Sequence, residues 1–191
     1  MKKNSIIIFI LLCLPMLSLA HVAVEAKVNP IGAFTGNIKL SAEVIPMENL
    51  GIEAGFGLSN FPISINIEDT ISLSGGGTGG SLAGKYYFMP SRGGDYFYVG
   101  AYTRFSNMDV DVEVLTTNRG TGKYSRAAVG LMAGFKWVST QNIVFELGGG
   151  VGRTVSHQLS ALDRDINLIA IPIINLDARL ILTVGYRFGG A

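Results

Sequence analysis

LDARLILTVGYRF, residues Leu176–Phe188 near the C-terminus, alternates without a break between two kinds of side chain. The even-numbered positions are all apolar: Leu176, Ala178, Leu180, Leu182, Val184, Tyr186 and Phe188. The odd-numbered positions carry Asp177, Arg179, Ile181, Thr183, Gly185 and Arg187. A period of two residues indicates a β-strand with one apolar and one mostly polar face. The length of this strand, in a chain with an export signal, predicts a transmembrane β-barrel.

The N-terminus has the pattern of a secretory signal. Two lysines follow the first methionine and precede an apolar core at 6–14, and Ser18-Leu19-Ala20 offers small residues at the −3 and −1 positions of a signal-peptidase site. We therefore predict a signal peptide over 1–20, cleaved after Ala20, and one outer-membrane β-barrel domain over 21–191.

Composition narrows the class. The net charge of +1 gives no reason to expect nucleic acid as a partner. The mean hydropathy is positive, at +0.38, yet after the signal no stretch approaches the roughly 18 apolar residues of a membrane helix. The single cysteine, Cys13, lies within the signal and follows Leu12, so we expect neither a lipoprotein anchor nor a disulfide. Alternating membrane strands account for a high apolar content without an apolar helix.

The same alternation recurs along the chain, and the connections set the strand number. Six further strands are predicted at 38–44, 52–59, 82–88, 97–106, 126–137 and 143–152. Short connections fall at 46–49, 90–94 and 139–142, and long polar ones at 66–80, 109–122 and 156–165. Bacterial barrels place short turns in the periplasm and long loops outside. Closure then requires a strand before 38–44, for which 27–34 is the available segment despite Pro30. The predicted fold is all-β, an eight-stranded antiparallel transmembrane β-barrel.

The two faces of the strands have different expected surroundings. A soluble, lipocalin-like periplasmic barrel would turn its apolar face inward, and a membrane barrel would turn it outward. Aromatic residues near the strand ends favour the membrane, because they form girdles at the interfaces. The predicted aromatic girdle comprises Phe88, Phe97, Phe105, Trp137, Tyr186 and Phe188. A soluble barrel remains the alternative.

The polar faces would then meet in the lumen. The predicted lumen charge network comprises Lys39, Glu43, Glu53, Lys85, Arg104, Arg126, Lys136, Glu146, Asp177, Arg179 and Arg187, interleaved with glycines that leave room for long side chains. The interior of an eight-stranded barrel is filled by its own side chains. Two interpretations stay open: a lattice of ion pairs that plugs the lumen, or a narrow ion path.

Three other motifs are weak candidates for chemistry. Gly75–Gly80 contains a glycine fingerprint, but no helix follows it as a nucleotide site requires, so we expect an outer loop. Asp109, Asp111 and Glu113 could together hold Ca²⁺, although a solvated loop is the expectation. The alternation also shifts at Val110, by a bulge or by a strand that rises above the bilayer.

A lipid-modifying enzyme is a further alternative. His157, with Ser156, Ser160 and Asp163 nearby, falls in a predicted loop. In a lipid A deacylase of this shape we expect the serine and histidine two residues apart on one strand face. His157 and Ser160 are three apart. We therefore predict no catalytic residues, no cofactor and no metal.

The chain contains six recognisable motifs: Lys27-Val28-Asn29-Pro30, Gly36-Asn37-Ile38, Ala42-Glu43, Gly84-Lys85-Tyr86-Tyr87-Phe88, Phe97 to Asn107, and Gly185-Tyr186-Arg187-Phe188. Together these motifs resemble a family of small outer-membrane barrel proteins common in Bacteroidota and of unknown function. The broader resemblance is to OmpX and to the OmpA membrane domain. It implies an eight-stranded barrel inserted by the barrel-assembly machinery, which reads a C-terminal strand with aromatic positions such as Tyr186 and Phe188. It implies no catalytic residues.

The sequence thus predicts a non-enzymatic barrel of the cell outer membrane, with a structural or surface-interaction role in the envelope. Its expected partners are outer-membrane lipid and lipopolysaccharide, the barrel-assembly machinery during insertion, and an extracellular ligand that the sequence does not identify. The alternatives are a small-solute channel and, less favoured, the lipid-modifying enzyme.

Overall fold

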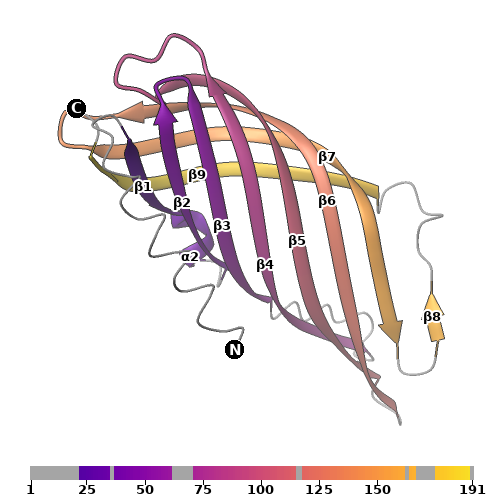
Figure 1. Ribbon diagram of the computed structural model, residues 1–191. Helices are drawn as coiled ribbons and strands as arrows, with labels where there is room; N and C mark the ends of the chain where they lie inside the picture. The colour runs from indigo at the N-terminus through magenta and orange to yellow at the C-terminus, as the bar shows by residue number, and fades with distance from the viewer. Residues whose placement is uncertain are drawn as a thin grey trace, which may run out of the picture.

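The computed structural model describes residues 22–34, 37–61, 71–114, 118–161, 164–166 and 175–189. The predicted signal peptide lies outside these ranges. The strands are β1 (Ala23–Val28), β2 (Asn37–Met47), β3 (Leu50–Phe61), β4 (Ile71–Tyr87), β5 (Tyr96–Val114), β6 (Asn118–Val138), β7 (Ile143–Ala161), β8 (Arg164–Ile166) and β9 (Leu176–Phe188). A short helix, α2 (Pro30–Phe34), connects β1 to β2 (Figure 1).

Eight of these strands form a closed barrel. Each strand from β1 to β7 pairs antiparallel with the next, and β9 pairs with both β7 and β1. The three-residue β8 pairs with the far end of β7 alone among the described strands, outside the ring. Closure gives every strand of the ring a partner on both sides, which is the condition for crossing lipid with strands. The predicted all-β, eight-stranded antiparallel barrel is confirmed.

The first strand differs from the predicted one. The segment predicted at 27–34 is mostly helix α2, and β1 lies earlier, at Ala23–Val28. Pro30 suits the first position of a helix, where its missing N–H costs no hydrogen bond. Asn29 caps the helix, because its Oδ1 accepts a hydrogen bond of 2.9 Å from the N–H of Gly32. Pro30 therefore begins a helix instead of interrupting a strand.

No helix in the part of the chain that the structure describes is long and apolar enough to cross a membrane.

The strands are longer than predicted, and they include much of the predicted loops. Gly75–Gly80, expected in an outer loop, belongs to β4 and pairs with β3 on one side and β5 on the other. β5 continues to Val114 with no shift of register, so the change of alternation at Val110 marks a continuing strand and not a bulge. The long ends of β4 to β7 project away from the end where β9 finishes and where the short connections gather (Figure 1). β6, with 21 residues, spans about 70 Å at roughly 3.4 Å per residue, far more than an apolar band of about 25 Å requires.

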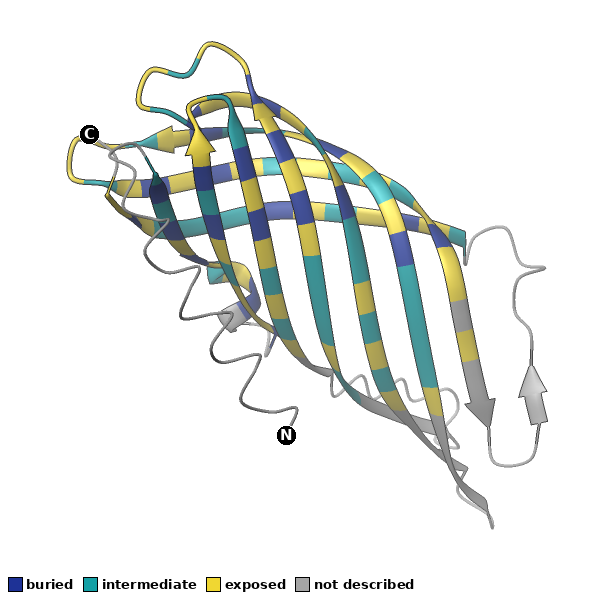
Figure 2. Ribbon diagram, viewed as in Figure 1, coloured by how far each residue is buried: buried dark blue, intermediate teal, exposed yellow. Residues whose placement is uncertain are grey.

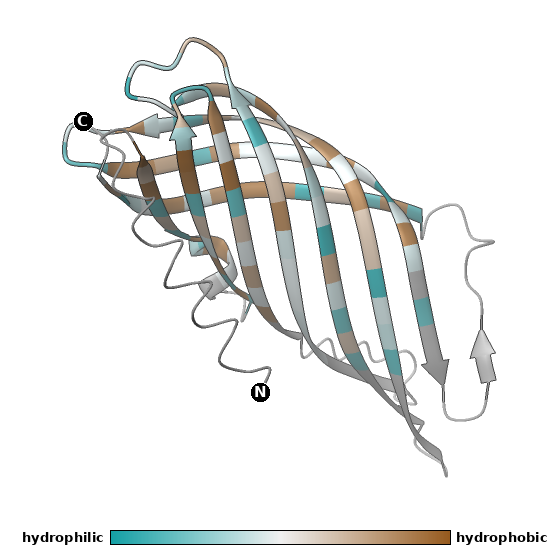
Figure 3. Cartoon of the chain, in the orientation of Figure 1, coloured by the Kyte–Doolittle hydropathy of each residue, from teal (hydrophilic) through white to brown (hydrophobic). Residues whose placement is uncertain are grey.

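Burial alternates along the strands (Figure 2), and many of the buried residues are polar or charged. Large apolar side chains such as Leu131 (70% exposed) and Leu180 (70% exposed) point outward, whereas Glu43, Glu146 and Asp177 are fully buried. The hydropathy of the ribbon alternates in the same way (Figure 3). This arrangement is the reverse of a soluble barrel, in which the apolar side chains fill the interior.

Candidate functional site: the charged lumen

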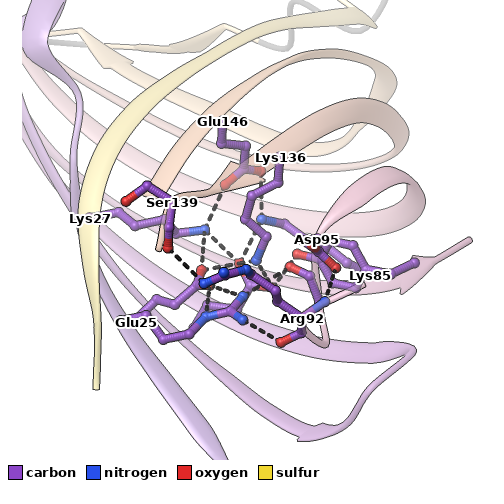
Figure 4. A network of polar contacts seen from close by, with 12 residues as sticks. Glu25, Lys27, Lys85, Arg92, Asp95, Lys136, Ser139 and Glu146 are labelled. Atoms are coloured by element: carbon purple, nitrogen blue, oxygen red, sulfur yellow. Dashed lines mark hydrogen bonds and ion pairs between the residues drawn. The ribbon is translucent and has the colours of Figure 1, made fainter. Parts of the chain in front are cut away.

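Two lysines share three carboxylates inside the barrel. Lys27 on β1 donates from Nζ to Glu43 at 2.5 Å, to Glu53 at 2.5 Å and to Glu146 at 2.7 Å. Lys85 on β4 donates to the same three residues at 2.9, 2.7 and 2.6 Å. The five side chains come from β1, β2, β3, β4 and β7, so the contacts join strands around the ring (Figure 4).

A second set of contacts continues from these toward the end of β9. Lys136 on β6 donates to Glu43 at 3.0 Å and to Glu25 at 2.9 Å. Arg187 on β9 donates from Nε and Nη2 to one oxygen of Glu25, at 2.9 and 2.6 Å. We call these eight residues the ion-pair cage: Glu25, Lys27, Glu43, Glu53, Lys85, Lys136, Glu146 and Arg187.

The cage is balanced in charge and removed from water. Its four cationic side chains face four carboxylates, and all eight side chains are between 0 and 5% exposed. Charges that are buried this deeply persist only when they are paired, because desolvating an unpaired ion costs several kcal/mol. The cage therefore forms a neutral, tightly bonded plug across the lumen.

Two tyrosines of β5 and β4 complete the cage. The hydroxyl of Tyr98 donates to Glu146 at 2.6 Å, and the hydroxyl of Tyr87 donates to Glu43. The ammonium of Lys85 lies 4.9 Å from the centre of the Tyr98 ring, where a cation is attracted to the π face. Both tyrosines are fully buried and belong to a small apolar cluster with Met132 and Ile181.

Glycines on β6 and β7 make room for the rings of β5. A Cβ added at Gly134 would lie 2.7 Å from Cζ of Tyr98, and one at Gly130 would lie 2.7 Å from Cε1 of Tyr102. A real Cβ essentially never comes this close to another heavy atom, so any larger residue would displace a ring. The glycines predicted to leave space for long charged side chains thus accommodate tyrosines here.

The connection between β4 and β5 closes the lumen beneath the cage. Arg187 donates from Nη1 to the carbonyl of Arg92 at 2.7 Å and from Nη2 to that of Gly94 at 3.2 Å. Arg92 in turn donates to the carbonyl of Ser139 in the β6–β7 connection at 3.0 Å (Figure 4). Asp95 holds the loop in shape by accepting hydrogen bonds from the N–H groups of residues 91 and 92. The barrel is therefore closed at the end with the short connections.

A glycine is required at one point of this loop. Gly94 has φ of +58°, and a Cβ there would lie 2.8 Å from Cδ1 of Ile45. Its N–H donates to the carbonyl of Glu48 at 2.6 Å, which ties the loop to the β2–β3 turn. Glycine alone adopts this backbone region without a steric penalty.

A second group of charges lies farther along the lumen, around Asp177 on β9. Asp177 is fully buried and accepts a hydrogen bond from Tyr102 at 2.6 Å, one from Arg126 at 2.6 Å and one from Arg104. Arg179 connects the two groups, because it donates to Glu53 of the cage at 3.4 Å and lies 5.4 Å from the Tyr102 ring centre.

The structure distributes the predicted lumen residues between these two groups. Six of them, Glu43, Glu53, Lys85, Lys136, Glu146 and Arg187, belong to the cage, and Arg104, Arg126, Asp177 and Arg179 belong to the second group. Lys39 lies on the lumen-facing side of the alternation in β2, but it is exposed. The predicted lumen set lacks Glu25, which precedes the predicted first strand at 27–34, and Lys27, which begins that strand. The alternation of Ala23, Glu25 and Lys27 with Val24, Ala26 and Val28 was the available signal.

Carboxylate oxygens of Glu43, Glu53 and Glu146 lie within 4.8 Å of one another, as the ligands of a metal ion do. The ammonium groups of Lys27 and Lys85 already contact all three side chains. This site therefore suits two ammonium ions better than a metal. Of the other predicted carboxylate group, Asp109 is exposed, and the side chains of Asp111 and Glu113 lie outside the described part.

The residues considered for lipid chemistry are not in a loop as predicted. Ser156, His157 and Ser160 belong to β7, which continues to Ala161. The β6–β7 register shifts between Ala127 and Ala128, so that Ser156 lies opposite Ala127. Ser156 is exposed, whereas the side chains of His157 and Ser160, and all of Asp163, lie outside the described part.

The predicted girdle residues all point outward, between 42% exposed for Phe88 and 55% for Phe105. Several form ring contacts near the closed end: Phe88 with Phe97 (centroids 5.7 Å apart), Tyr86 with Phe88 (5.2 Å), Phe135 with Trp137 (4.5 Å) and Tyr186 with Phe188 (4.9 Å). Farther along the barrel, Phe56 and Phe105 both pair with Gly80 and form part of a second row. The two rows bound an apolar outer surface.

Comparison with known proteins finds similarity in fold only. No family model and no curated protein matches it. Among solved structures, a major outer membrane protein from Thermus thermophilus is similar, with a TM-score of 0.58 and 17% identity over 87% of this chain and 98% of that one. The N-terminal β-barrel domain of Pseudomonas aeruginosa OprF (TM-score 0.44, 15% identity, 87% and 96% covered) and neisserial surface protein A (0.41, 12%, 88% and 95%) are also found. At 17% identity, the Thermus structure supports the shared barrel fold. The resemblance to a Bacteroidota family and to OmpX stays a prediction.

Proposed function

We propose that this protein is an integral barrel of the outer membrane, with a non-catalytic structural or surface-interaction role in the cell envelope. The observation that carries this proposal is the inverted distribution of side chains. Apolar residues cover the outside of the closed barrel, and charged side chains, most of them paired, fill the inside. Soluble proteins rarely expose a continuous apolar surface of more than a few hundred Å², whereas lipid solvates such a surface.

The aromatic rows also support a lipid environment around the barrel. Phe97 and Phe105 lie eight residues apart on the outer face of β5, or roughly 26 Å along the strand and about 20 Å in height after the usual tilt. Such rows suit the two interfaces of an outer membrane. Outer-membrane lipid and lipopolysaccharide are then the proposed lateral partners, and the barrel-assembly machinery the partner in insertion.

The cage favours a closed barrel over the small-solute channel. A solute would have to break the contacts that Lys27 and Lys85 make with three carboxylates, and it would then meet the loop held by Arg187. A role outside the lumen therefore fits better, and the long ends of β4 to β7 offer the surface for it. The proposed outward direction of these ends follows from the short connections at the opposite end.

The location is tested by expressing the full chain in a Gram-negative host and fractionating the envelope. We expect the protein in the outer-membrane fraction, resistant to extraction with alkaline carbonate, and with a faster gel mobility before boiling than after. Recovery in the soluble periplasm would contradict the proposal. Planar-bilayer recording distinguishes the closed barrel from the small-solute channel. A channel would give a steady conductance above the bilayer baseline.

A further inference from the structure

Positive charge is concentrated in the lumen beyond the cage. Lys39, Arg104, Arg126 and Arg179 surround a single described carboxylate, Asp177, which leaves a surplus of three positive charges. We call these four cationic residues and Asp177 the cationic vestibule. The neighbouring cage is balanced, so it supplies no spare negative charge beyond the contact of Glu53 with Arg179 at 3.4 Å.

The three arginines of the vestibule are only partly exposed to water, whereas Lys39 is exposed. The side chains of Arg104, Arg126 and Arg179 are 30, 20 and 16% exposed. Charges in such surroundings interact several times more strongly than in bulk water. Like charges held together there repel one another, and an incoming anion relieves that repulsion in addition to forming its own contacts.

Arg179 contains a buried donor that no described group satisfies. Its Nη1 is buried and has no hydrogen-bond partner, although an unsatisfied buried donor costs roughly 1–3 kcal/mol. Its guanidinium lies 5.4 Å from the Tyr102 ring centre and donates from Nη2 to Glu53. These contacts hold the guanidinium plane in place and leave Nη1 unsatisfied, so an anion would reach Nη1 only after a small movement of the side chain.

Lys39 adds a cation that has no ion-pair partner among the described residues. The stem of Lys39 lies over Gly57, where an added Cβ would come within 3.3 Å of its Cγ, so the side chain runs along the lumen wall. It is near enough to Arg104 and Arg179 for their charges to repel it. No hydrogen bond or ion pair from its ammonium to another described residue is present.

We propose that the cationic vestibule binds a small oxyanion of phosphate type. A planar guanidinium donates two parallel hydrogen bonds to a phosphate or carboxylate, which a spherical halide cannot accept in that geometry. The surplus of charge favours a doubly charged anion over a singly charged one. Because the cage closes the barrel on one side, the anion reaches the vestibule only from the end where β4 to β7 project.

The test uses the full mature barrel, refolded in a zwitterionic detergent and titrated with inorganic phosphate by calorimetry at constant ionic strength. We expect saturable binding at millimolar concentration, competition by sulfate, and weaker binding of acetate and chloride. Titration with short-chain phosphatidic acid compares a lipid phosphate with the free ion. Binding of the lipid form alone assigns the site to a headgroup, and binding of inorganic phosphate assigns it to a soluble ion.

Variants connect the binding to these residues. Arg179→Gln should weaken phosphate binding roughly tenfold, the effect of losing one charge-assisted pair, and Lys39→Gln should also weaken it. Arg153→Gln is the matched control, because Arg153 is exposed on the outer face of β7 and not in the lumen. Heat-modifiable mobility shows that each variant is folded. Absence of saturable binding by the folded wild-type barrel, or an equal loss in Arg153→Gln, would overturn the proposal. Neither result depends on where the protein resides in the cell.

Discussion

Neutralising Glu43 should weaken the barrel more than any single surface change. Glu43 accepts hydrogen bonds from Lys27 at 2.5 Å, Lys85 at 2.9 Å, Lys136 at 3.0 Å and the hydroxyl of Tyr87. Glu43→Gln leaves the cage with one unbalanced positive charge that is fully buried. Breaking a buried pair from one side costs about 3–5 kcal/mol, so we expect the free energy of unfolding to fall by that amount.

The assay is guanidinium unfolding of the barrel in lipid vesicles, followed by the fluorescence of Trp137, the single tryptophan. Glu48→Gln is the matched control, because Glu48 is exposed in the β2–β3 turn and its removal should change stability by less than about 0.5 kcal/mol.

A second change separates charge balance from simple loss of contacts. Lys136→Met in the Glu43→Gln background restores neutrality, while Glu25 keeps its two hydrogen bonds from Arg187. We expect the double variant to recover stability, with a coupling energy of about 2–3 kcal/mol between the two positions. A loss in Glu43→Gln no larger than in Glu48→Gln, or additive losses in the double variant, would refute the reasoning about the cage.

Three further variants test the tyrosines, the outer face and the closed end. Tyr98→Phe removes the hydroxyl that donates at 2.6 Å to a cage carboxylate, and should lower the free energy of unfolding by about 1–3 kcal/mol. Leu131→Lys places a charge on the outer face, 70% exposed and opposite the midpoint of the aromatic rows. In lipid vesicles it should cost about 2–4 kcal/mol, and Thr140→Lys, in an exposed turn, should cost much less. Arg187→Lys keeps the charge but loses the fork that holds the loop carbonyls, so trypsin should cleave after the exposed Arg92 faster than in the wild type.

Each of these has a clear contrary result. Unchanged stability of Tyr98→Phe would mean that water replaces the hydroxyl inside the cage. Equal effects of Leu131→Lys and Thr140→Lys would show that the outer face does not meet lipid. An unaltered cleavage rate in Arg187→Lys would show that the loop is held by its other contacts, such as the hydrogen bond between Gly94 and Glu48.

The alternation of residues could be read from the sequence because it is a local property of extended backbone. Successive side chains of a strand point to opposite faces. The alternation of polar and apolar residues therefore assigns Lys85, Glu146 and Arg187 to the lumen face without any knowledge of strand pairing. Two local errors followed from weaker signals. The sequence predicts a strand through Pro30 and an outer loop at Gly75–Gly80, whereas Pro30 begins helix α2 and the glycines belong to β4. Glycine has low strand propensity, so the pairing of these glycines with β3 and β5 is decided by the neighbouring strands.

The sequence by itself determined the strand class, the number of strands needed for closure and the sides that the charges occupy. Only the tertiary structure decided which charges meet. Lys27 and Glu146 are 119 positions apart in the chain, and their contact at 2.7 Å depends on β9 joining β7 to β1. The register of every pair around the ring sets the height of each side chain in the lumen. Local periodicity carries no such register, so the division into a balanced cage and a cationic vestibule appears only when the barrel is closed.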